Sequence, residues 1–289
     1  MKNIKKLFFC LVFTLFVFIP TLTFAHNPVT VTSNEIIVTD PEISKAYYAE
    51  LTGKPHIYYI KSDEPFNLYV NLLVPDIKDQ KKDTIAQILK INKDINTEIV
   101  LTSLEGTGYK WTNYFEPFGS DKYWKGPEFK IRAEAGEYEI RVRSPQFDGK
   151  YALAIGEAES FGLEETIGSI DKIIKNKKEF FGKSPISFIF SPIGFGYIIV
   201  MFLFAFIFGF VYRLIIKKIN KNKIRGVVKN INKKDRIIRV ILGLALLILA
   251  ITTTWNPILF FFAGFCFFEA IFSWCGLYAA LGKNTCPVE

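Results

Sequence analysis

The sequence is poor in the residues on which metal sites, disulfides and acid–base catalysis depend. Its 289 residues include only two His and four Cys, and no Cys lies between Cys10 and Cys266. A domain in that interval cannot use disulfides and must depend on a hydrophobic core. Two His leave little material for a metalloenzyme or a Ser-His hydrolase, and no other catalytic constellation is assembled. We therefore expect a protein that is not an enzyme, with no catalytic residues, no metal site and no cofactor.

Basic and acidic residues nearly balance along most of the chain, and a large excess of one sign occurs in only one short segment. The net charge is +8, yet residues 26–212 carry a slight excess of acidic side chains. Residues 213–239 carry 11 basic residues against Asp235 alone. Lys and Arg concentrated in a short loop are typical of the cytoplasmic side of a membrane protein. No nucleic-acid recognition motif accompanies them, so we expect no nucleic-acid partner.

The N-terminus has the pattern of a targeting segment. Three Lys within the first six residues precede the apolar run Leu7–Ile19, and Thr23-Phe24-Ala25 places small residues at positions −3 and −1 of a cleavage site. This pattern predicts a secretory signal peptide over residues 1–25, which would export the part of the chain that follows.

Residues 26–160 predict an all-β extracytoplasmic sandwich. Short β-branched and aromatic segments alternate with turn residues, which is typical of antiparallel sandwiches. In one of these segments Tyr138, Ile140 and Val142 share a face, opposite Glu139 and Arg141. The expected strands are Val29–Val38, Ala46–Leu51, His56–Lys61, Phe66–Val74, Thr84–Ile91, Glu98–Leu104, Glu128–Ala133, Tyr138–Arg143 and Tyr151–Gly156.

An aromatic-rich stretch, Glu105–Gly126, is predicted as a loop. Its residues Trp111, Tyr114 and Trp124 form a candidate platform for a glycan, a peptide or a protein partner, because large aromatics provide much contact area at low entropic cost. The alternative is that the loop folds back and caps one end of the sandwich, since so many aromatics rarely stay exposed together.

Residues 135–142 and 149–156 have the pattern of a closing hairpin, with a Gly turn and alternating apolar residues. In this they resemble the last strands of bacterial pre-peptidase C-terminal (PPC-type) β-sandwich modules. The resemblance implies a non-catalytic accessory domain.

Cleavage after Ala25 would leave His26 at the mature N-terminus. In this position it resembles the N-terminal His of copper-binding histidine-brace proteins. The second ligand would have to be His56, on an expected strand. The alternative is that His26 merely follows the cleavage site and His56 is an ordinary sheet residue.

Residues 161–185 predict an amphipathic linker helix. Leu163, Ile167, Ile170 and Ile174 follow near-helical spacing, with charged residues between them. Such a helix either lies on the bilayer surface or packs against the sandwich.

Three apolar stretches follow, each long enough to cross a bilayer as a helix. They are residues 193–216, 237–254 and 257–274. Only Trp255-Asn256 separates the last two, so they should form a helical hairpin within residues 237–286. We thus expect an α-helical transmembrane region of three spans.

The orientation follows from two independent signals. The signal peptide places residues 26–190 outside, and the basic loop 217–236 should stay in the cytoplasm together with the C-terminal tail. The sequence therefore predicts a bacterial cytoplasmic (inner) membrane protein.

The C-terminal region resembles a known family. Residues 230–286 look like the YgaP-like inner-membrane domain. The motifs that carry the resemblance are Asp235-Arg236-x-x-Arg239 at the entry of the hairpin, and Cys275-x-Leu-Tyr and Leu-Gly-x-x-Thr-Cys286 at its exit. The resemblance implies a small two-helix membrane domain of undefined role. Gly276 stands where Pro is usual, and Asn232 stands where Gly is common, a change that Asn tolerates if the backbone is left-handed.

Two of the cysteines are candidate redox thiols. Cys275 and Cys286 should lie at the cytoplasmic face near Arg236 and Arg239, and nearby cations lower a thiol pKa. The alternative is that both are idle reduced thiols. Cys266 lies inside a span and is expected to be a small apolar residue.

Glu269 is the one acidic residue inside an expected span. An unpaired carboxylate there is costly, and the hairpin could bring it to Arg236 or Arg239 as an intramembrane ion pair. The alternative is that Glu269 reaches the membrane interface.

These expectations combine into one leading function: an envelope protein anchored in the lipid bilayer, whose non-catalytic β-sandwich binds or scaffolds an unknown envelope protein or glycan. The alternative is a redox or sulfur-linked membrane protein that uses Cys275 and Cys286.

Overall fold

The structure is a computed structural model that describes residues 27–92, 96–117, 119–158, 163–219 and 229–286. The chain divides into two compact units, residues 1–183 and 184–289. The expected signal peptide and His26 lie outside the described residues, as do residues 220–228 of the basic loop.

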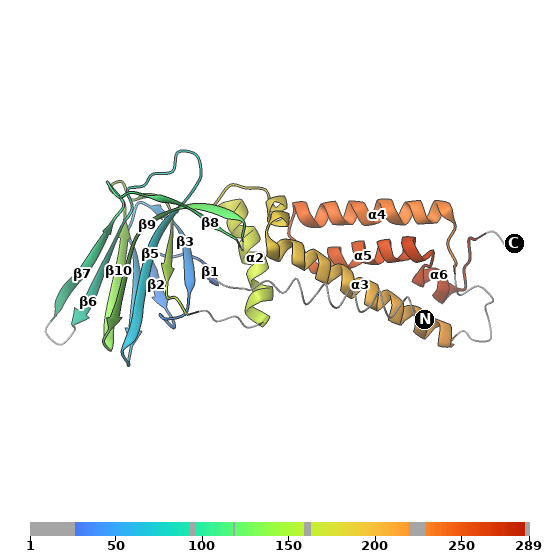
Figure 1. Cartoon of the computed structure of the whole chain (residues 1–289), viewed down its shortest axis with the longest axis horizontal. Helices are drawn as coiled ribbons and strands as arrows, with labels where there is room; N and C mark the ends of the chain where they lie inside the picture. Colours follow the sequence, from blue (N-terminus) through green and yellow to red (C-terminus); the bar gives the residue numbers. More distant parts are fainter. Residues whose placement is uncertain (1–26, 93–95, 118, 159–162, 220–228, 287–289) are drawn as a thin grey trace. The chain divides into compact units, whose positions relative to one another are not determined.

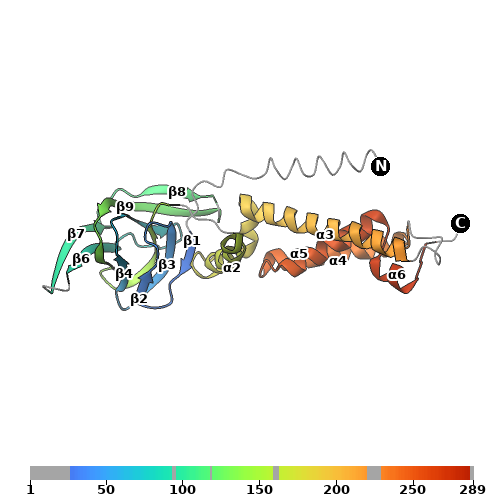
Figure 2. The same ribbon diagram turned by 90° about the horizontal axis from the view of Figure 1, so that it is seen from below.

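The first unit contains a β domain built of two mixed sheets (Figures 1 and 2). One sheet has the order β1-β3-β11-β5-β9-β8 and the other β2-β4-β10-β6-β7. The strands are β1 Asn27–Thr30, β2 Glu35–Val38, β3 Lys45–Thr52, β4 His56–Ser62, β5 Phe66–Pro75, β6 Ile85–Asn92, β7 Thr97–Glu105, β8 Thr112–Glu116, β9 Asp121–Ala133, β10 Gly136–Arg143 and β11 Asp148–Ile155.

The inner faces of both sheets share one hydrophobic core. The predicted alternation in β10 is confirmed: Tyr138, Ile140 and Val142 are buried, and the residues between them are more exposed. β11 behaves differently, because Leu153 belongs to the inner core while Ala152 and Ala154 pack into a second cluster on the outer face. Its sheet is therefore covered on both sides, which explains the uninterrupted apolar run in β11.

Several strand predictions are wrong in how the strands pair. The expected strand Val29–Val38 is two strands, since β1 pairs with β3 in one sheet and β2 with β4 in the other. Both pairings are parallel, so the sandwich is not purely antiparallel. β10 and β11 do not form a closing hairpin, because they lie in opposite sheets. The pattern behind the PPC resemblance is therefore an inter-sheet connection.

The predicted loop Glu105–Gly126 is also wrong over most of its length. β8 pairs antiparallel with the first part of β9, which begins at Asp121 instead of Glu128. Polar and aromatic residues without clean alternation hid these strands, because β8 is a mostly exposed edge strand.

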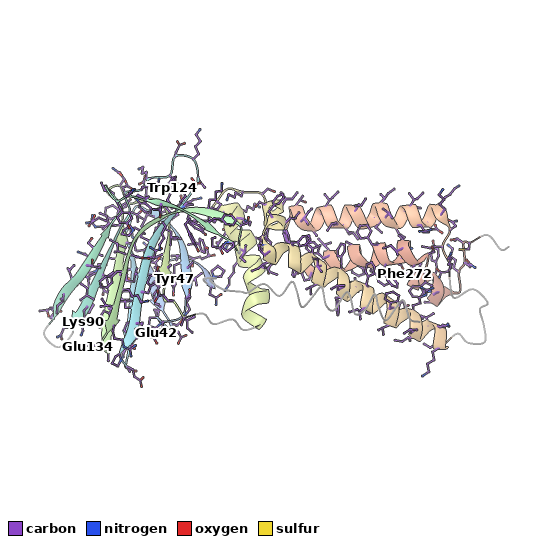
Figure 3. The ribbon with its side chains drawn as sticks, in the orientation of Figure 1. Glu42, Tyr47, Lys90, Trp124, Glu134 and Phe272 are labelled. Carbon is purple, nitrogen blue, oxygen red and sulfur yellow. The ribbon has the colours of Figure 1, made fainter. Side chains whose placement is uncertain are left out.

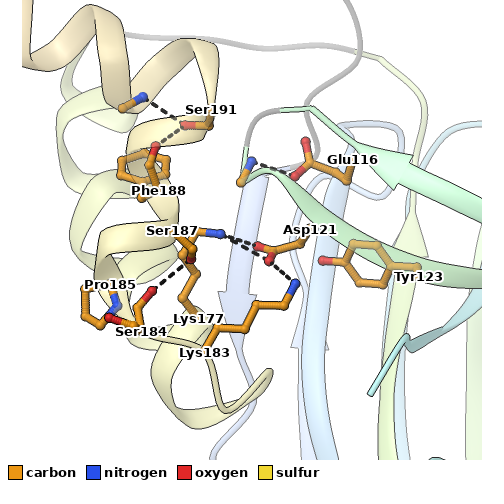
Figure 4. Close-up of polar contacts among 12 residues, drawn as sticks. Glu116, Asp121, Tyr123, Lys177, Lys183, Ser184, Pro185, Ser187, Phe188 and Ser191 are labelled. Carbon is orange, nitrogen blue, oxygen red and sulfur yellow. Dashed lines mark hydrogen bonds and ion pairs between the residues drawn. The ribbon is translucent and has the colours of Figure 1, made fainter. Parts of the chain in front are cut away.

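The helix α2, Leu163–Glu179, packs against the β domain near β1 (Figures 1 and 2). Of the two alternatives for the linker helix, the structure thus has the packed one. Phe180 and Phe181, just after the helix, cover the outer face of the sheet around Tyr123. The contact is also polar, because the Lys177 ammonium is fully buried and lies 3.1 Å from both carboxylate oxygens of Asp121 (Figure 4).

The second unit consists of helices. They are the 3-10 helix η1 Pro185–Phe190 and the α-helices α3 Pro192–Ile219, α4 Lys233–Thr252, α5 Pro257–Phe272 and α6 Gly276–Leu281. α5 packs against both α3 and α4. Small residues make these approaches close: a Cβ on Gly209 would lie 2.6 Å from the Phe268 ring.

By length and composition, α3 alone among the described helices is apolar and long enough to be a clear membrane span. Its 28 residues reach about 42 Å. α5 is apolar but has 16 residues, and α4 begins with charged residues. The structure therefore supports one span outright and leaves the predicted three-span arrangement as a proposal.

Candidate functional site

The aromatic residues predicted to bind a ligand do not form one platform. Trp111 and Trp124 pack against the core between the sheets. Trp124 is labelled in Figure 3. The indole N–H of Trp111 donates to the Gly106 carbonyl at 2.9 Å, and that of Trp124 donates to Asp76 at 3.1 Å. Tyr114 instead packs with the outer-face cluster. The hairpin thus contributes aromatic side chains to two cores, whereas the capping alternative predicted a loop folded over one end of the sandwich.

His56 lies in the core with its ring already engaged. It is 4% exposed, and its Nδ1 lies 2.7 Å from the Tyr151 hydroxyl, which is 2.8 Å from the Tyr58 hydroxyl. This chain of hydrogen bonds links the two sheets through a polar contact in the core. Because His26 lies outside the described residues, the copper alternative has no described pair of His ligands.

His56 makes the β domain sensitive to acid. Burial lowers its pKa below the ordinary 6.5, so the folded domain keeps it neutral where the unfolded chain binds a proton. Stability should be constant above about pH 6.5 and fall below it, by at most about 1.4 kcal/mol per pH unit. Urea unfolding of residues 27–183 between pH 7.5 and 5.5 measures this. His56→Gln should flatten the profile, and an equally steep profile in that variant would assign the effect to other groups.

The helical unit contains a cluster of buried and partly buried polar residues. We call it the polar junction, and it comprises Asn230, Asp235, Arg239, Glu269, Cys275 and Thr285. These residues come from the segment before α4, the first turns of α4, the end of α5, the α5–α6 connection and the C-terminal tail. The fold therefore brings the start of α4 and the end of α5 together.

Glu269 and Arg239 form its centre. Glu269 is 4% exposed, and its Oε2 lies 3.2 Å from Arg239 Nε. Its Oε1 accepts the Gly276 N–H at 3.0 Å. Of the two arginines predicted to pair with Glu269, Arg239 therefore does so. Arg236 donates instead to the Ala270 carbonyl at 2.8 Å, which satisfies a free carbonyl in the last turn of α5.

Cys275 lies beside this pair. Arg239 Nη2 is 3.3 Å from Cys275 Sγ, as expected for a thiol near a cation. The predicted lowering of its pKa is nevertheless wrong, because burial dominates and raises the pKa of the Cys275 thiol above its ordinary value. The thiol form is favoured, which makes Cys275 a poor nucleophile. Cys286 is partly exposed, and its Sγ donates to the Ile231 carbonyl at 3.3 Å.

The cysteines should differ in reactivity. In the folded protein in detergent, Cys286 should react with a maleimide well before Cys275, which is 1% exposed, and before Cys266, which is 7% exposed. Mass spectrometry of a labelling time course measures the three rates. In SDS all three should label together, which serves as the control. Equal rates for Cys275 and Cys286 in the folded protein would show that the junction opens.

Asn230 and Thr285 are junction residues that the sequence analysis did not single out as site residues. The Asn230 side chain accepts the Cys275 N–H at 2.7 Å and donates to the Cys275 carbonyl at 2.9 Å. The Thr285 N–H donates to the Asn230 carbonyl at 3.1 Å, and its hydroxyl donates to Asp235. Both residues fall within the family-like stretch, and that membership was the available signal.

The two departures from the family pattern now have physical reasons. Gly276 provides the N–H that binds Glu269, which Pro lacks. A Cβ there would also lie 2.4 Å from the Tyr212 ring of α3, so Gly276 makes room for the additional helix. Asn232 has extended backbone, contrary to the left-handed expectation, and its side chain caps α4 by accepting the Asp235 N–H at 2.9 Å.

The contacts in the junction are structural, because they join α4, α5 and the C-terminal tail to one another. Arg239 and Glu269 pair with each other, and Asp235 accepts the Thr285 hydroxyl, which is the condition for burying charged groups at tolerable cost. Among the described residues, no group of three or more His, Cys, Asp and Glu side chains is arranged to hold a metal ion.

The comparison with protein families agrees with this geometry. Residues 227–289 match the family model described as the transmembrane domain of YgaP-like inner membrane proteins, which confirms the predicted resemblance and its position. The match covers every residue of the polar junction. A search of curated proteins finds no match to the chain. The chain is therefore a membrane-associated protein with a β-rich domain and a YgaP-like transmembrane domain.

Proposed function

We propose that this protein is a non-enzymatic envelope protein of the bacterial cytoplasmic membrane, which displays its β domain outside the cell membrane to bind a protein or glycan partner. In this proposal α3, α4 and α5 all cross the bilayer, and the C-terminal tail is cytoplasmic. The observation that carries it is the free edge of β7, where the β domain exposes apolar side chains.

Contacts within the helical unit support three spans. At one end, Trp255 between α4 and α5 donates to the carbonyl of Pro185 at 3.1 Å, in the helix η1 that leads into α3. At the other end, the Tyr212 hydroxyl near the end of α3 lies 3.5 Å from the Gly276 carbonyl after α5. α5 therefore runs alongside α3, and α4 returns between the same two levels (Figure 1). A bilayer that accommodates α3 would contain all three.

In the helical unit, the polar groups of the junction bond to one another and to the backbone. This favours placing the binding role in the β domain. β7 is an outer strand of its sheet, and its first four described residues, 97–100, are all exposed. Ile99 and Val100 are each 53% exposed. From residue 99 to 104 the strand has no charge and no Pro, two features with which natural edge strands block pairing. Such an edge can accept an extended segment of a partner.

A photocrosslinking amino acid tests this surface. Introduced at Ile99 in living cells, it should yield one defined crosslinked species on the outer side of the membrane. Ile37 is the matched control, because it is 78% exposed and lies on β2 at the opposite edge of the same sheet. No product from position 99, or the same products from both positions, would refute the proposed surface.

The orientation has its own test. A membrane-impermeant maleimide should label Ile37→Cys in intact cells and should reach Cys286 only after lysis. Labelling of Cys286 from outside would overturn the proposed topology.

The redox alternative has one observation in its favour, namely that the backbone N–H of Cys275 and the thiol of Cys286 contact neighbouring residues, Asn230 and Ile231. If these thiols are functional, exposure of cells to a disulfide-forming oxidant should join them before denaturation. Mass spectrometry that finds both reduced in the folded protein would remove this alternative.

A further inference from the structure

The short helix η1 leaves two large apolar side chains exposed. Phe190 is 81% exposed, the highest value for a large apolar side chain among the described residues. Ile186, four residues earlier, is 40% exposed. Contiguous exposed apolar surface marks a site of interaction with a partner or a membrane.

The opposite side of η1 is held rigidly. Phe188 is fully buried, and its ring lies 4.8 Å from the Trp255 ring. Pro185, three residues before it, accepts the Trp255 indole N–H at 3.1 Å. Residues three apart eclipse in a 3-10 helix, so Pro185 and Phe188 share the buried side. Ile186 and Phe190 are thereby directed away from it.

Hydrogen bonds and close packing hold the end of η1 against the start of α3. The Ser191 hydroxyl donates to the Phe188 carbonyl at 2.9 Å and accepts the Gly194 N–H at 2.9 Å. A Cβ on Gly194 would lie 2.0 Å from the Phe188 oxygen, so only Gly allows this approach. η1 is therefore fixed at the level where the apolar span begins.

We propose that η1 is a lipid-binding interfacial segment, whose Phe190 and Ile186 insert between phospholipids at the boundary of headgroups and acyl chains. The proposal rests on the membrane anchor of the proposed function. Phospholipid is the occupant because α3, the apolar span, begins two residues after Phe190 and itself exposes Phe195 at 49%. Aromatic side chains at the end of a span favour that depth of the bilayer. Trp255, buried behind η1, holds the segment there.

A photoreactive phospholipid tests this with the unaltered full chain. The protein is reconstituted in phosphatidylcholine vesicles that contain lipids with a diazirine either near the glycerol or at the acyl-chain end. After illumination, mass spectrometry locates the adducts. The glycerol-proximal probe should label Phe190 and Ile186, and should leave the buried Phe188 unlabelled. The chain-end probe should label Phe204 in α3, which is 58% exposed.

The controls separate this inference from the anchor itself. Ile37 in the β domain is 78% exposed but should carry no adduct, because exposure alone is not the criterion. Adducts on Phe204 without any on Phe190 would overturn the interfacial segment and leave the anchor intact. No adducts on Phe204 would overturn both. Adducts on Phe190 that appear only when the protein is diluted in the bilayer would assign this residue to a contact between copies, which also overturns the proposal.

Discussion

Replacing Asp121 with Ala should detach α2 from the β domain. Lys177 is 0% exposed and pairs with both oxygens of Asp121, while Lys183 lies 3.0 Å from one of them (Figure 4). Without the carboxylate, the buried ammonium loses its hydrogen-bonded counter-charge, and removing one member of a buried pair costs about 3–5 kcal/mol. Urea unfolding of residues 27–183 measures the loss, and hydrogen exchange in α2 should rise with it.

Two further variants make this test specific. Asp148→Ala breaks an exposed pair with Lys81 at 2.8 Å and should cost less than about 1 kcal/mol. The double variant Asp121→Leu with Lys177→Met removes both charges and should recover most of the stability, because apolar replacements of a buried pair are tolerated. If Asp121→Ala behaves like Asp148→Ala, the buried pair does not hold α2.

Glu269→Leu should have the largest effect in the helical unit. It leaves the Arg239 guanidinium without its carboxylate and the Gly276 N–H without its acceptor. Because the Arg239 side chain keeps 22% exposure, we expect a loss near the lower end for buried pairs, about 3 kcal/mol. Unfolding by SDS in mixed micelles measures it, and the abundance of the variant in the membrane should fall.

The matched control lies on the same helix. Ile271 is 59% exposed, so Ile271→Ala should change the unfolding little. Glu269→Gln keeps an acceptor for Gly276 but loses the charge, and should fall between the two. Unchanged stability of Glu269→Leu would mean that the carboxylate reaches solvent instead of joining α4 to α5.

Patterns that depend on one segment were predictable. The alternation of β10 and the long apolar run of α3 depend on the period of side chains along a strand or helix and on its length. The pairing of Glu269 with an arginine was predictable in kind, since a carboxylate among apolar residues needs a partner. Which arginine it would be was not predictable, because Arg236 and Arg239 are three residues apart on one helix and differ only in what α5 presents to each.

Features that depend on distant segments were missed or mispredicted. β8 and the first part of β9 have no clean period, so only their pairing makes them strands. The hydroxyl of Tyr151 meets His56 from the opposite sheet, and Asn230 meets Cys275 across 45 residues of chain. The rise in the Cys275 pKa likewise follows from burial, which a list of nearby charges does not contain.

Three features follow from the sequence alone. They are the division into a β-rich part and an apolar helical part, the position of the longest span, and the family of the C-terminal region. These depend on composition and local period, which each segment carries regardless of its neighbours. Tertiary structure decided which sheet each strand joined, where α2 packed, and which groups met in the polar junction. Those outcomes depend on which buried polar atoms can satisfy one another across the fold, and that choice is made only when the segments come together.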